Sequence, residues 1–485
     1  MVSLRTDTWD SILIDIGADY RRTRQGTRQN AFSILAPPVV LLTVVSAIAG
    51  IGHLPTRAAE RSPAAFLLFT GNTVGFLDEC GCPKTPMGGL DKRAGYLTAL
   101  RRRWPAAQQL LFDVGNFSDL PGPSGDAKTR GIVQALNKLD YQAVGVGERE
   151  LSLGVGHFLS LTAGARFPFV SANLVRDSDG ATWLRPYKLI EQAGLRVAVI
   201  GVTRFNPMMR LELPGGARLI TRDPEAALGV HIASLRDSVD LVVVLALVPL
   251  DEARVLALRV PGIDLVFGAY GDRVTGEPLR VNRTQILYAG DQGKYLGEVA
   301  VTRAPDGDWE LIGRTVALTR AIPPDPALEA HIIEVLAEAH DAERTHRSSA
   351  MAQGAEPVRG YLGAGACTGC HAEIVSNWAQ TRHARAFETL ERHASGGPRP
   401  NCVRCHVTGY GQPTGFVDPD TTPHLMGVSC EACHGGAAEH VEVPERPYGN
   451  ATLATCTSCH TAEQDPAFNY YRDRQLVDHS SVAGP

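Results

Sequence analysis

Four copies of a short motif in the last quarter of the chain combine two thiols with an imidazole. Each copy reads Cys-x-x-Cys-His, at residues 367–371, 402–406, 430–434 and 456–460. Two cysteines three positions apart can bond to the two vinyl groups of one haem, and the histidine that follows can bind the iron. The spacing therefore predicts four c-type haems. The attachment residues are Cys367, Cys370, Cys402, Cys405, Cys430, Cys433, Cys456 and Cys459, and the proximal iron ligands are His371, His406, His434 and His460.

Zinc ribbons and disulfides also use cysteines at this spacing, but neither needs the histidines. Histidine is only 15 of the 485 residues, so finding it after all four CxxC units by chance is on the order of one in a million. Covalent haem attachment is therefore the interpretation that the motif favours. The segment also lacks long apolar runs, so we expect a mostly α-helical, loop-rich domain in which haem forms most of the core.

Five further histidines lie in the same segment: His383, His393, His424, His440 and His479. Four haems need at most four ligands on the second face of the iron, and His393 is left out because it lies in a polar loop. Histidine on both faces saturates the iron and favours electron transfer, whereas an open face allows a substrate to bind. Counting histidines leaves both possibilities open for each haem.

The N-terminal residues predict export from the cytoplasm. Residues 31–51 are almost wholly apolar and follow a basic stretch with four arginines between positions 21 and 28. This is the order of a signal peptide, with Ala47-Ile48-Ala49 as a small-residue cleavage site. The stretch of about 20 residues is also long enough for an uncleaved anchor. We expect the periplasmic side of the cytoplasmic membrane, with the protein either anchored by residues 31–51 or released after cleavage.

Length and composition limit the remaining possibilities. A chain of 485 residues with 44% hydrophobic residues indicates two or three folded domains rather than a disordered chain. With 47 Lys+Arg against 52 Asp+Glu, the formal net charge is -5. This balance argues against nucleic acid as a partner.

Short apolar runs alternate with helical patterns in the first part of the chain. The predicted strands are 66–69, 110–112, 198–200, 241–247 and 265–267, and the predicted helices are 90–103, 130–139 and 224–237. This order predicts an α/β domain. A proline-rich boundary and an amphipathic helix over 327–346 follow. We therefore divide the chain into a cytoplasmic tail with signal peptide or anchor (1–60), the α/β domain (61–322), a linker helix and linker (323–359) and the haem domain (360–485).

The haem segment resembles the tetrahaem cytochrome c-554 family. The likeness rests on residues such as Trp378-Ala-Gln-Thr-Arg-His383 and covers nearly all of residues 360–485. In that family the haems are closely packed and pass electrons, most have a second histidine ligand, and one can be five-coordinate. The resemblance implies His383, His424, His440 and His479 as the distal ligands, without assigning each to an iron.

The α/β domain resembles the 5'-nucleotidase type of calcineurin-like metallophosphoesterase, a layered αββα fold. Leu67-Leu-Phe-Thr-Gly-Asn72 and Leu111-Phe-Asp-Val-Gly115-Asn116 follow the family's order. Such enzymes hold two metal ions at strand ends with Asp, His and Asn side chains. The corresponding positions here are Asn72, Val74, Asn116, Glu148, Arg149, Leu247, Tyr270 and Asp272. Because several of these side chains cannot bind metal, the resemblance implies a scaffold without a di-metal centre and argues against hydrolysis.

Cys80 and Cys82 lie in the loop after the first predicted strand. One interpretation is a structural turn with a strained disulfide. The other is a redox dithiol, or a site for a soft metal or a sulfur species. The sequence leaves both interpretations open.

Together these features predict an exported multihaem c-type cytochrome that relays electrons among periplasmic or membrane redox donors and acceptors. One alternative is an oxidoreductase that acts on a small nitrogen or sulfur species at a five-coordinate haem. Another is a 5'-nucleotidase-like phosphoesterase.

Overall fold

The computed structural model describes residues 61–80, 86–352, 360–393, 403–412, 414–445, 448–461, 465 and 467–479. The predicted signal peptide or anchor at 31–51 lies outside these residues, as do Cys82 and Cys402. Of Cys80 and His393 only the backbone is described. Within the described ranges, none of the helices has both the length and the apolar character needed to cross a membrane.

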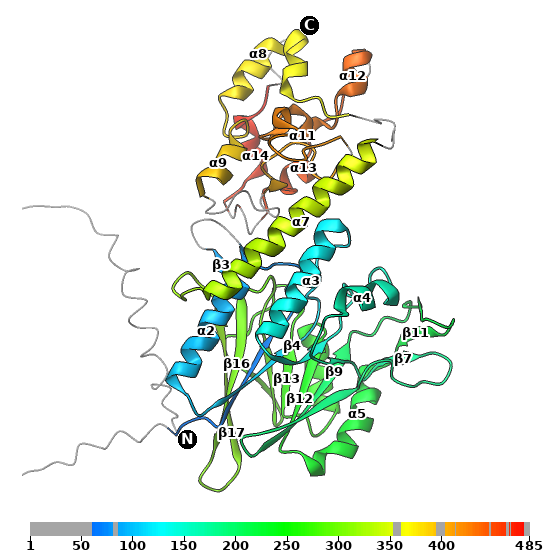
Figure 1. The fold of residues 1–485 in the computed structure, drawn as a ribbon, viewed down its shortest axis with the longest axis vertical. Helices are drawn as coiled ribbons and strands as arrows, with labels where there is room; N and C mark the ends of the chain where they lie inside the picture. Colours follow the sequence, from blue (N-terminus) through cyan, green and yellow to red (C-terminus); the bar gives the residue numbers. More distant parts are fainter. Residues whose placement is uncertain are drawn as a thin grey trace, which may run out of the picture. The chain divides into compact units, whose positions relative to one another are not determined.

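Two six-stranded sheets form the centre of the α/β domain (Figure 1). The first has the strand order β17-β16-β1-β4-β5-β6 and the second the order β14-β15-β13-β12-β9-β8. The strands of the first sheet are β1 (Ala65–Thr70), β4 (Gln108–Asp113), β5 (Tyr141–Gly145), β6 (Phe169–Val170), β16 (Tyr295–Arg303) and β17 (Trp309–Ala317). The strands of the second sheet are β8 (Tyr187–Gln192), β9 (Leu195–Thr203), β12 (Leu241–Leu247), β13 (Leu265–Gly268), β14 (Leu279–Val281) and β15 (Thr284–Tyr288).

Four neighbouring strands of each sheet are parallel. In the first sheet β1, β4, β5 and β6 run in one direction, and in the second sheet β9, β12, β13 and β15 do so. In the first sheet β16 pairs antiparallel with β1, and β17 pairs antiparallel with β16. In the second sheet β8 and β14 pair antiparallel at the two edges. Parallel neighbours bring their carboxyl ends to one edge of a sheet, which is where loops can gather functional side chains.

Alternating apolar residues explain how the sheets are covered. Phe66 and Leu68 of β1 pack with the helices on the outer face of the first sheet, whereas Leu67 and Phe69 pack against the second sheet. Helices α5 and α6 cover the outer face of the second sheet, which gives the predicted αββα layers. The helices are α2 (Leu90–Arg103), α3 (Pro123–Lys138), α4 (Val155–Thr162), α5 (Pro224–Leu235), α6 (Leu250–Arg259) and α7 (Pro326–Ala352).

Shorter elements complete this domain. They are β2 (Glu79–Cys80), β3 (Met87–Gly88), β7 (Leu174–Arg176), β10 (Leu211–Glu212), β11 (Arg218–Thr221) and the 3-10 helix η3 (Arg236–Ser238). Strand β2 pairs with β3, and β10, β11 and β7 form a small separate sheet. These elements lie outside the two large sheets.

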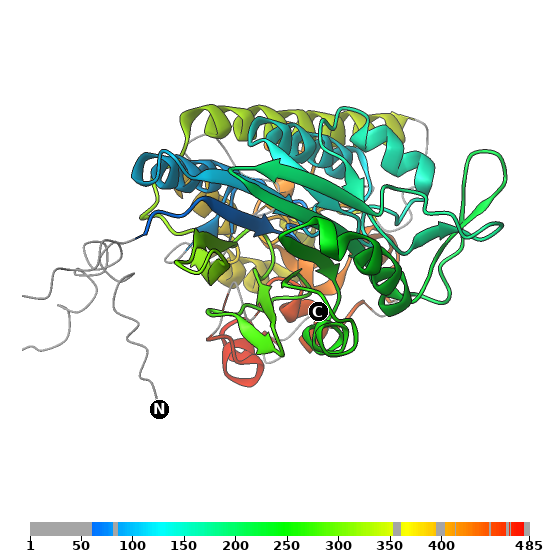
Figure 2. The ribbon, with the colours of Figure 1, turned by 90° about the horizontal axis from the view of Figure 1, so that it is seen from below.

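Several predicted elements are confirmed. Helix 90–103 and strand 241–247 have the predicted bounds, whereas the helix predicted at 130–139 already begins at Pro123. The helix predicted at 327–346 is α7, which runs beside α3 (Figure 2). Asp325 Oδ1 caps it by accepting from the amides of Ala327 and Leu328. Close packing on α3 depends on Gly131, where a Cβ would lie 2.3 Å from Val335 Cγ1.

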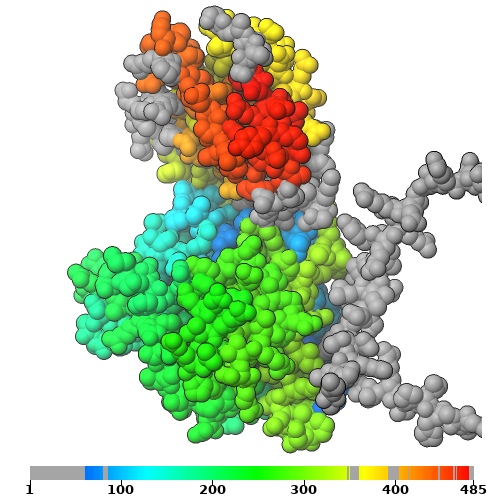
Figure 3. Space-filling model, turned by 180° about the vertical axis from the view of Figure 1, so that it is seen from behind, coloured from blue at the N-terminus to red at the C-terminus, as the bar shows by residue number. Residues whose placement is uncertain are grey.

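The cysteine- and histidine-rich region consists of short helices and loops. Its elements are η4 (Ala364–Cys367), α8 (Thr368–Ala379), α9 (Ala386–His393), η5 (Pro423–Leu425), α11 (Cys430–His434), α12 (Ala438–Glu442), α13 (Leu453–Thr457), α14 (Tyr470–Asp473) and η6 (Arg474–Leu476). Several large apolar side chains are open to solvent, among them Tyr471 at 82% and Leu476 at 77%. Figure 3 shows this end of the chain, in red, at the surface. The described part of the region therefore has a small protein core.

Candidate functional site

Loops that follow the parallel strands meet at the carboxyl-terminal edge of the two sheets. Thr203 is the last residue of β9 in the second sheet, and Val146 directly follows β5 in the first sheet. Thr203 Oγ1 donates to Val146 O over 2.8 Å, so the carboxyl-terminal edges of the two sheets are in contact. A Cβ on Gly147 would lie 2.1 Å from Asn116 Oδ1 and 2.5 Å from Leu247 Cδ2. The structure therefore brings together positions that the sequence assigned to the phosphoesterase-type site.

The asparagine side chains at this edge bond to each other and to nearby loops. Asn116 Nδ2 donates to Asn72 Oδ1 over 3.4 Å, and Asn72 Nδ2 donates to Gly271 O over 3.1 Å. Arg149 N donates to Asn116 Oδ1 over 3.1 Å, and its Nε donates to Ser118 O over 2.9 Å. Both asparagines have positive φ, 50° for Asn72 and 55° for Asn116, a conformation that asparagine tolerates better than most residues. Their amide oxygens are thus engaged within the protein.

Glu150 joins the loops after β4 and β5. Its buried carboxylate accepts from the backbone amides of Asn116 and Gly147 at 2.8 Å each, and from that of Ser118 at 2.9 Å. The sequence does not indicate this role, because an acidic residue in a loop gives no sign of the backbone amides from which it will accept hydrogen bonds. Its charge is satisfied by backbone donors rather than by a cation.

We expect Glu150→Gln to destabilise the α/β domain by about 2 kcal/mol, because an amide replaces a charged acceptor of three N–H groups. Urea unfolding followed by circular dichroism measures the change. The matched control is Glu148→Gln, which alters an exposed carboxylate two positions away and should change the free energy of unfolding by less than about 0.5 kcal/mol. Equal losses in the two variants would contradict the joining role of Glu150.

Several of the side chains at this edge are poor ligands for divalent metal ions. Val74 and Leu247 offer only hydrocarbon. Tyr270 OH accepts a 2.7 Å hydrogen bond from Arg204 Nη1, and the Arg204 guanidinium lies 5.2 Å from the tyrosine ring centroid. In the described part of the chain, no three His, Cys, Asp or Glu side chains are grouped to hold a metal ion. Two-metal sites are built from such donors, and these positions supply few of them.

Strand β2, which ends at Cys80, is fixed by ion pairs at Glu79. Glu79 Oε2 accepts from Lys92 Nζ over 2.7 Å, and Oε1 accepts from Arg320 Nη2 over 3.0 Å. Burial raises the pKa of Glu79, but hydrogen bonds from the two cations outweigh burial, and the pKa lies below its usual value. The chemistry of the Cys80 and Cys82 thiols stays a prediction.

In the C-terminal region, three of the proximal histidines each face one of the distal candidates. The pairs, with the distances between ring centroids, are His371 and His440 at 6.5 Å, His460 and His383 at 6.1 Å, and His434 and His479 at 5.8 Å. Two imidazoles that bind opposite faces of one metal ion at about 2 Å have centroids roughly 6 Å apart. The three pairs therefore have the spacing that iron held between two histidines would need.

Short elements distant in the sequence supply each pair. His371 lies in α8, where its φ of -123° and ψ of 40° interrupt the helix, and His440 lies in α12. His383 lies in the turn between α8 and α9, and His460 follows α13. Burial lowers the pKa of His383, and the nearby His460 adds to this effect. A neutral imidazole is the form that binds metal.

The fourth proximal histidine, His406, has a different setting. Its Nδ1 lies 2.7 Å from Ala386 O and 3.2 Å from Thr389 Oγ1. Over the residues that the structure describes, no second imidazole ring is recorded against His406, and the remaining distal candidate, His424, is exposed on η5. The structure thus brings three of the four distal candidates to a proximal histidine and does not bring His424 to one.

Thiols from different motifs also meet. The Cys367 thiol lies beside that of Cys430, and the Cys405 thiol lies beside that of Cys459. Interaction with the partner thiol, together with burial, raises the pKa of Cys367 and of Cys405. The first motif therefore lies beside the third, and the second beside the fourth, so the haems that these motifs bind would be close neighbours.

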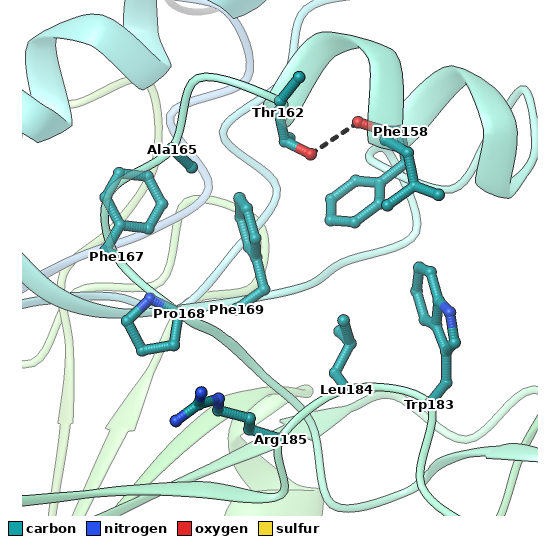
Figure 4. A pocket seen from close by; sticks show the side chains of 11 residues that line it. Phe158, Thr162, Ala165, Phe167, Pro168, Phe169, Trp183, Leu184 and Arg185 are labelled. Carbon is teal, nitrogen blue, oxygen red and sulfur yellow. Dashed lines mark hydrogen bonds between the residues drawn. The ribbon is translucent and has the colours of Figure 1, made fainter.

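A separate cavity of about 390 Å³ lies in the α/β domain beside α4. Figure 4 shows Phe158, Phe167, Phe169 and Trp183 around it, with Arg185 at one side. The hydroxyl of Thr162 donates to Phe158 O over 2.8 Å and is not directed at a ligand. The cavity contains none of the residues for which the sequence predicts chemistry, and we assign it no function.

The fold and the histidine pairs define a two-part protein, a phosphoesterase-type αββα domain followed by a segment built to hold c-type haem. Residues 366–435 match the family model described as cytochrome c554 and c-prime. Cytochrome c-554 of Nitrosomonas europaea is 34% identical over 83 residues, which are 14% of this chain and 35% of that protein. The C-terminal resemblance predicted from the sequence is thereby confirmed.

The α/β domain is similar to 5'-nucleotidases. Snake venom 5'-nucleotidase of Naja atra is 27% identical over 271 residues, which are 50% of this chain and 50% of that protein. The structure of sulfate thiohydrolase SoxB of Thermus thermophilus in complex with glycerol aligns with a TM-score of 0.51 at 20% identity, over 58% of this chain and 61% of that one. This second likeness shows the fold alone. The chain spans half or less of the length of the two curated relatives named here.

Proposed function

We propose that this protein is an exported c-type cytochrome that transfers electrons through four haems attached to residues 360–485. The observation that carries the proposal is the spacing of the three imidazole pairs, each of which joins a CxxCH histidine to a distant one. A c-type haem, when bound, supplies an iron that accepts and gives up one electron. The match to the cytochrome c554 family model supports this use.

Each group of residues has its own role in the proposal. The eight motif cysteines would attach the macrocycles, and His371, His406, His434 and His460 would be iron ligands. His440, His479 and His383 would be further iron ligands at the first, third and fourth motifs. Bis-histidine ligation leaves no position for a substrate, which suits electron transfer. The partners would be redox donors and acceptors in the periplasm or membrane.

Export belongs to the same proposal. Covalent haem attachment of this kind is completed outside the cytoplasm, and the basic and apolar order of the first 51 residues is that of a signal peptide or anchor. Retention of residues 31–51 in the mature protein would leave it tethered to the membrane. Mass spectrometry of the mature N-terminus distinguishes cleavage from retention.

A second candidate function is favoured by the setting of His406. Because no imidazole in the described residues is recorded against its ring, the second motif is the place where an iron would keep an open face. An open face would allow a small nitrogen or sulfur species to bind and be reduced or oxidised. Under this alternative the other three sites supply electrons to the second motif.

The α/β domain is, in this proposal, a phosphoesterase fold without a di-metal centre, used for docking or for a separate small-molecule site. Hydrocarbon side chains at Val74 and Leu247 and the Arg204–Tyr270 contact support it. The purified protein should therefore hydrolyse neither nucleotides nor p-nitrophenyl phosphate when Mn²⁺ or Mg²⁺ is added. Metal-dependent hydrolysis would restore the phosphoesterase alternative.

Haem analysis tests the main proposal. The full chain, purified from a host that attaches c-type haem, should contain four haems, and electron paramagnetic resonance should show at least three low-spin irons. A fourth low-spin iron would favour a pure electron relay. One high-spin iron that changes when small ligands are added would favour the second candidate function. A chain without covalently attached haem would contradict both.

A further inference from the structure

The four proximal histidines differ in what their second ring nitrogen contacts. His371 Nδ1 is buried, and no hydrogen-bond partner for it is found among the described residues. His406 Nδ1 donates to Ala386 O over 2.7 Å, and His434 Nδ1 donates to Gly449 O. Only at His460, within the described residues, does a carboxylate accept from the proximal imidazole, with 2.8 Å between Nδ1 and Asp465 Oδ2. The four sites therefore range from no acceptor, through a neutral carbonyl, to a charged acceptor.

The charge of the acceptor matters for a bound metal. A ring N–H that donates to a carboxylate shifts electron density toward the opposite nitrogen, because the proton is partly drawn to the anion. The imidazole then becomes a stronger donor through Nε2, which stabilises the more positive oxidation state of the iron it binds. A neutral carbonyl has a weaker effect, and an absent acceptor has none.

Local contacts hold Asp465 in place for this bond. Asp465 N donates to Thr461 O over 2.8 Å, and Phe468 N donates to Asp465 O over 3.0 Å, so two backbone hydrogen bonds fix the position of Asp465. The Phe468 ring stacks on His460 with 4.6 Å between centroids and 18° between planes. The nearby Arg472 is bound through two nitrogens to Asp473, at 2.5 Å and 2.8 Å. Arg472 also interacts electrostatically with Asp465, but the hydrogen bond to the Asp465 carboxylate comes from His460.

We propose that Asp465 is a positioning residue that lowers the reduction potential of the iron bound by His460 and makes this site the last of the four to be reduced. The inference rests on the proposed haem binding. It gives the chain a direction, because a site that is hardest to reduce accepts electrons only from a strongly reducing donor and passes them readily to the other sites. The sequence did not indicate Asp465, since an acid five positions after a histidine resembles any surface carboxylate.

Potentiometric titration of the haem-loaded full chain tests this role, with optical and electron paramagnetic resonance detection. Asp465→Asn keeps the shape but removes the charge, and it should make the last reduction step easier by about tenfold in the reduced-to-oxidised ratio, a rise of about 59 mV. Asp465→Glu keeps the negative charge and should therefore keep the potential of the last reduction step close to the wild-type value. The matched control is Asp473→Asn, which removes a neighbouring carboxylate that does not bond to His460 Nδ1. Asp473 also interacts electrostatically with His460, so this control should raise that potential clearly less than Asp465→Asn does.

A second variant links the step to the site. His383→Ala removes the ring that faces His460, so the iron that becomes high-spin should be the one that titrates last in the wild type. This readout does not depend on how well Asp465→Asn incorporates haem. If a different step changes, or if Asp473→Asn shifts the last step as much as Asp465→Asn, the inference is overturned. Haem content separates the role of Asp465 from the proposed function. If Asp465→Asn holds four haems and its last reduction step is unchanged, only the role of Asp465 is overturned. If the full chain holds no haem, the proposed function is overturned.

Discussion

Without covalently attached haem, the full chain is expected to keep a folded α/β domain and to lose the fold of residues 360–485. The described part of that segment has one buried apolar cluster, formed by Phe387, Val403, Val407, Phe416 and Leu425. Such a cluster cannot offset the conformational entropy of ordering a segment of this length. The exposed apolar side chains of α14 and η6 have the character of surfaces that a haem face would cover.

Limited proteolysis measures this effect on chains made with and without the host machinery that attaches haem. Cleavage within residues 360–485 should be at least about tenfold faster without haem, because an unfolded segment needs no prior opening. Residues 61–322 provide an internal control, since their two large sheets and the four buried clusters described there do not involve the haem motifs. Equal resistance of residues 360–485 in both preparations would contradict a haem-dependent core.

Local patterns in the sequence were sufficient to predict much of the α/β domain. Strand 241–247 is buried along its whole length and therefore reads as a continuous apolar run. The helix at 90–103 shows a periodic pattern and was predicted with its bounds. The flanking strands β8 and β17 were not predicted, because their half-exposed residues give no continuous run. Their positions depend on hydrogen bonding to neighbouring strands, β9 for β8 and β16 for β17.

Some functional residues could be predicted from local sequence, and others could not. The CxxCH motifs are local, so attachment cysteines and proximal histidines could be read directly from spacing. The distal partners could not be assigned, because His371 meets His440 and His460 meets His383 only when separate loops fold together. The bond between Asp465 and His460 needs the same folded turn. Sequence thus predicts which groups are present, and tertiary structure determines which iron each one would affect.

Contacts between cysteines and between histidines also link the haem motifs to one another. The contacts Cys367–Cys430 and Cys405–Cys459 join motifs that are not consecutive in the chain. The histidine pairs add a different set of links, since the turn after α8 supplies His383 to the fourth motif. A ligand change at one site therefore also removes a link between distant segments, and a spectroscopic readout is needed to separate ligation from packing.

Replacing His440 by alanine is expected to convert about a quarter of the bound iron from low-spin to high-spin. The physical reason is the loss of the imidazole that faces His371 at 6.5 Å between centroids. His440 also stacks on Tyr448, with 4.8 Å between centroids and 9° between planes. Tyr448→Leu therefore serves as the packing control, because it removes the stacked ring and leaves the imidazole. Electron paramagnetic resonance and the optical spectrum of the ferric protein measure the spin state.

His424→Ala is the matched ligand control, since it makes the same substitution at an exposed histidine of the same region. It should leave all low-spin signals in place, because the described structure brings no second imidazole to His424. A high-spin signal from His424→Ala, with none from His440→Ala, would reverse the assignment of the two residues. High-spin iron in Tyr448→Leu equal to that in His440→Ala would instead mean that the stacked tyrosine, and not the imidazole alone, holds the iron in its low-spin state.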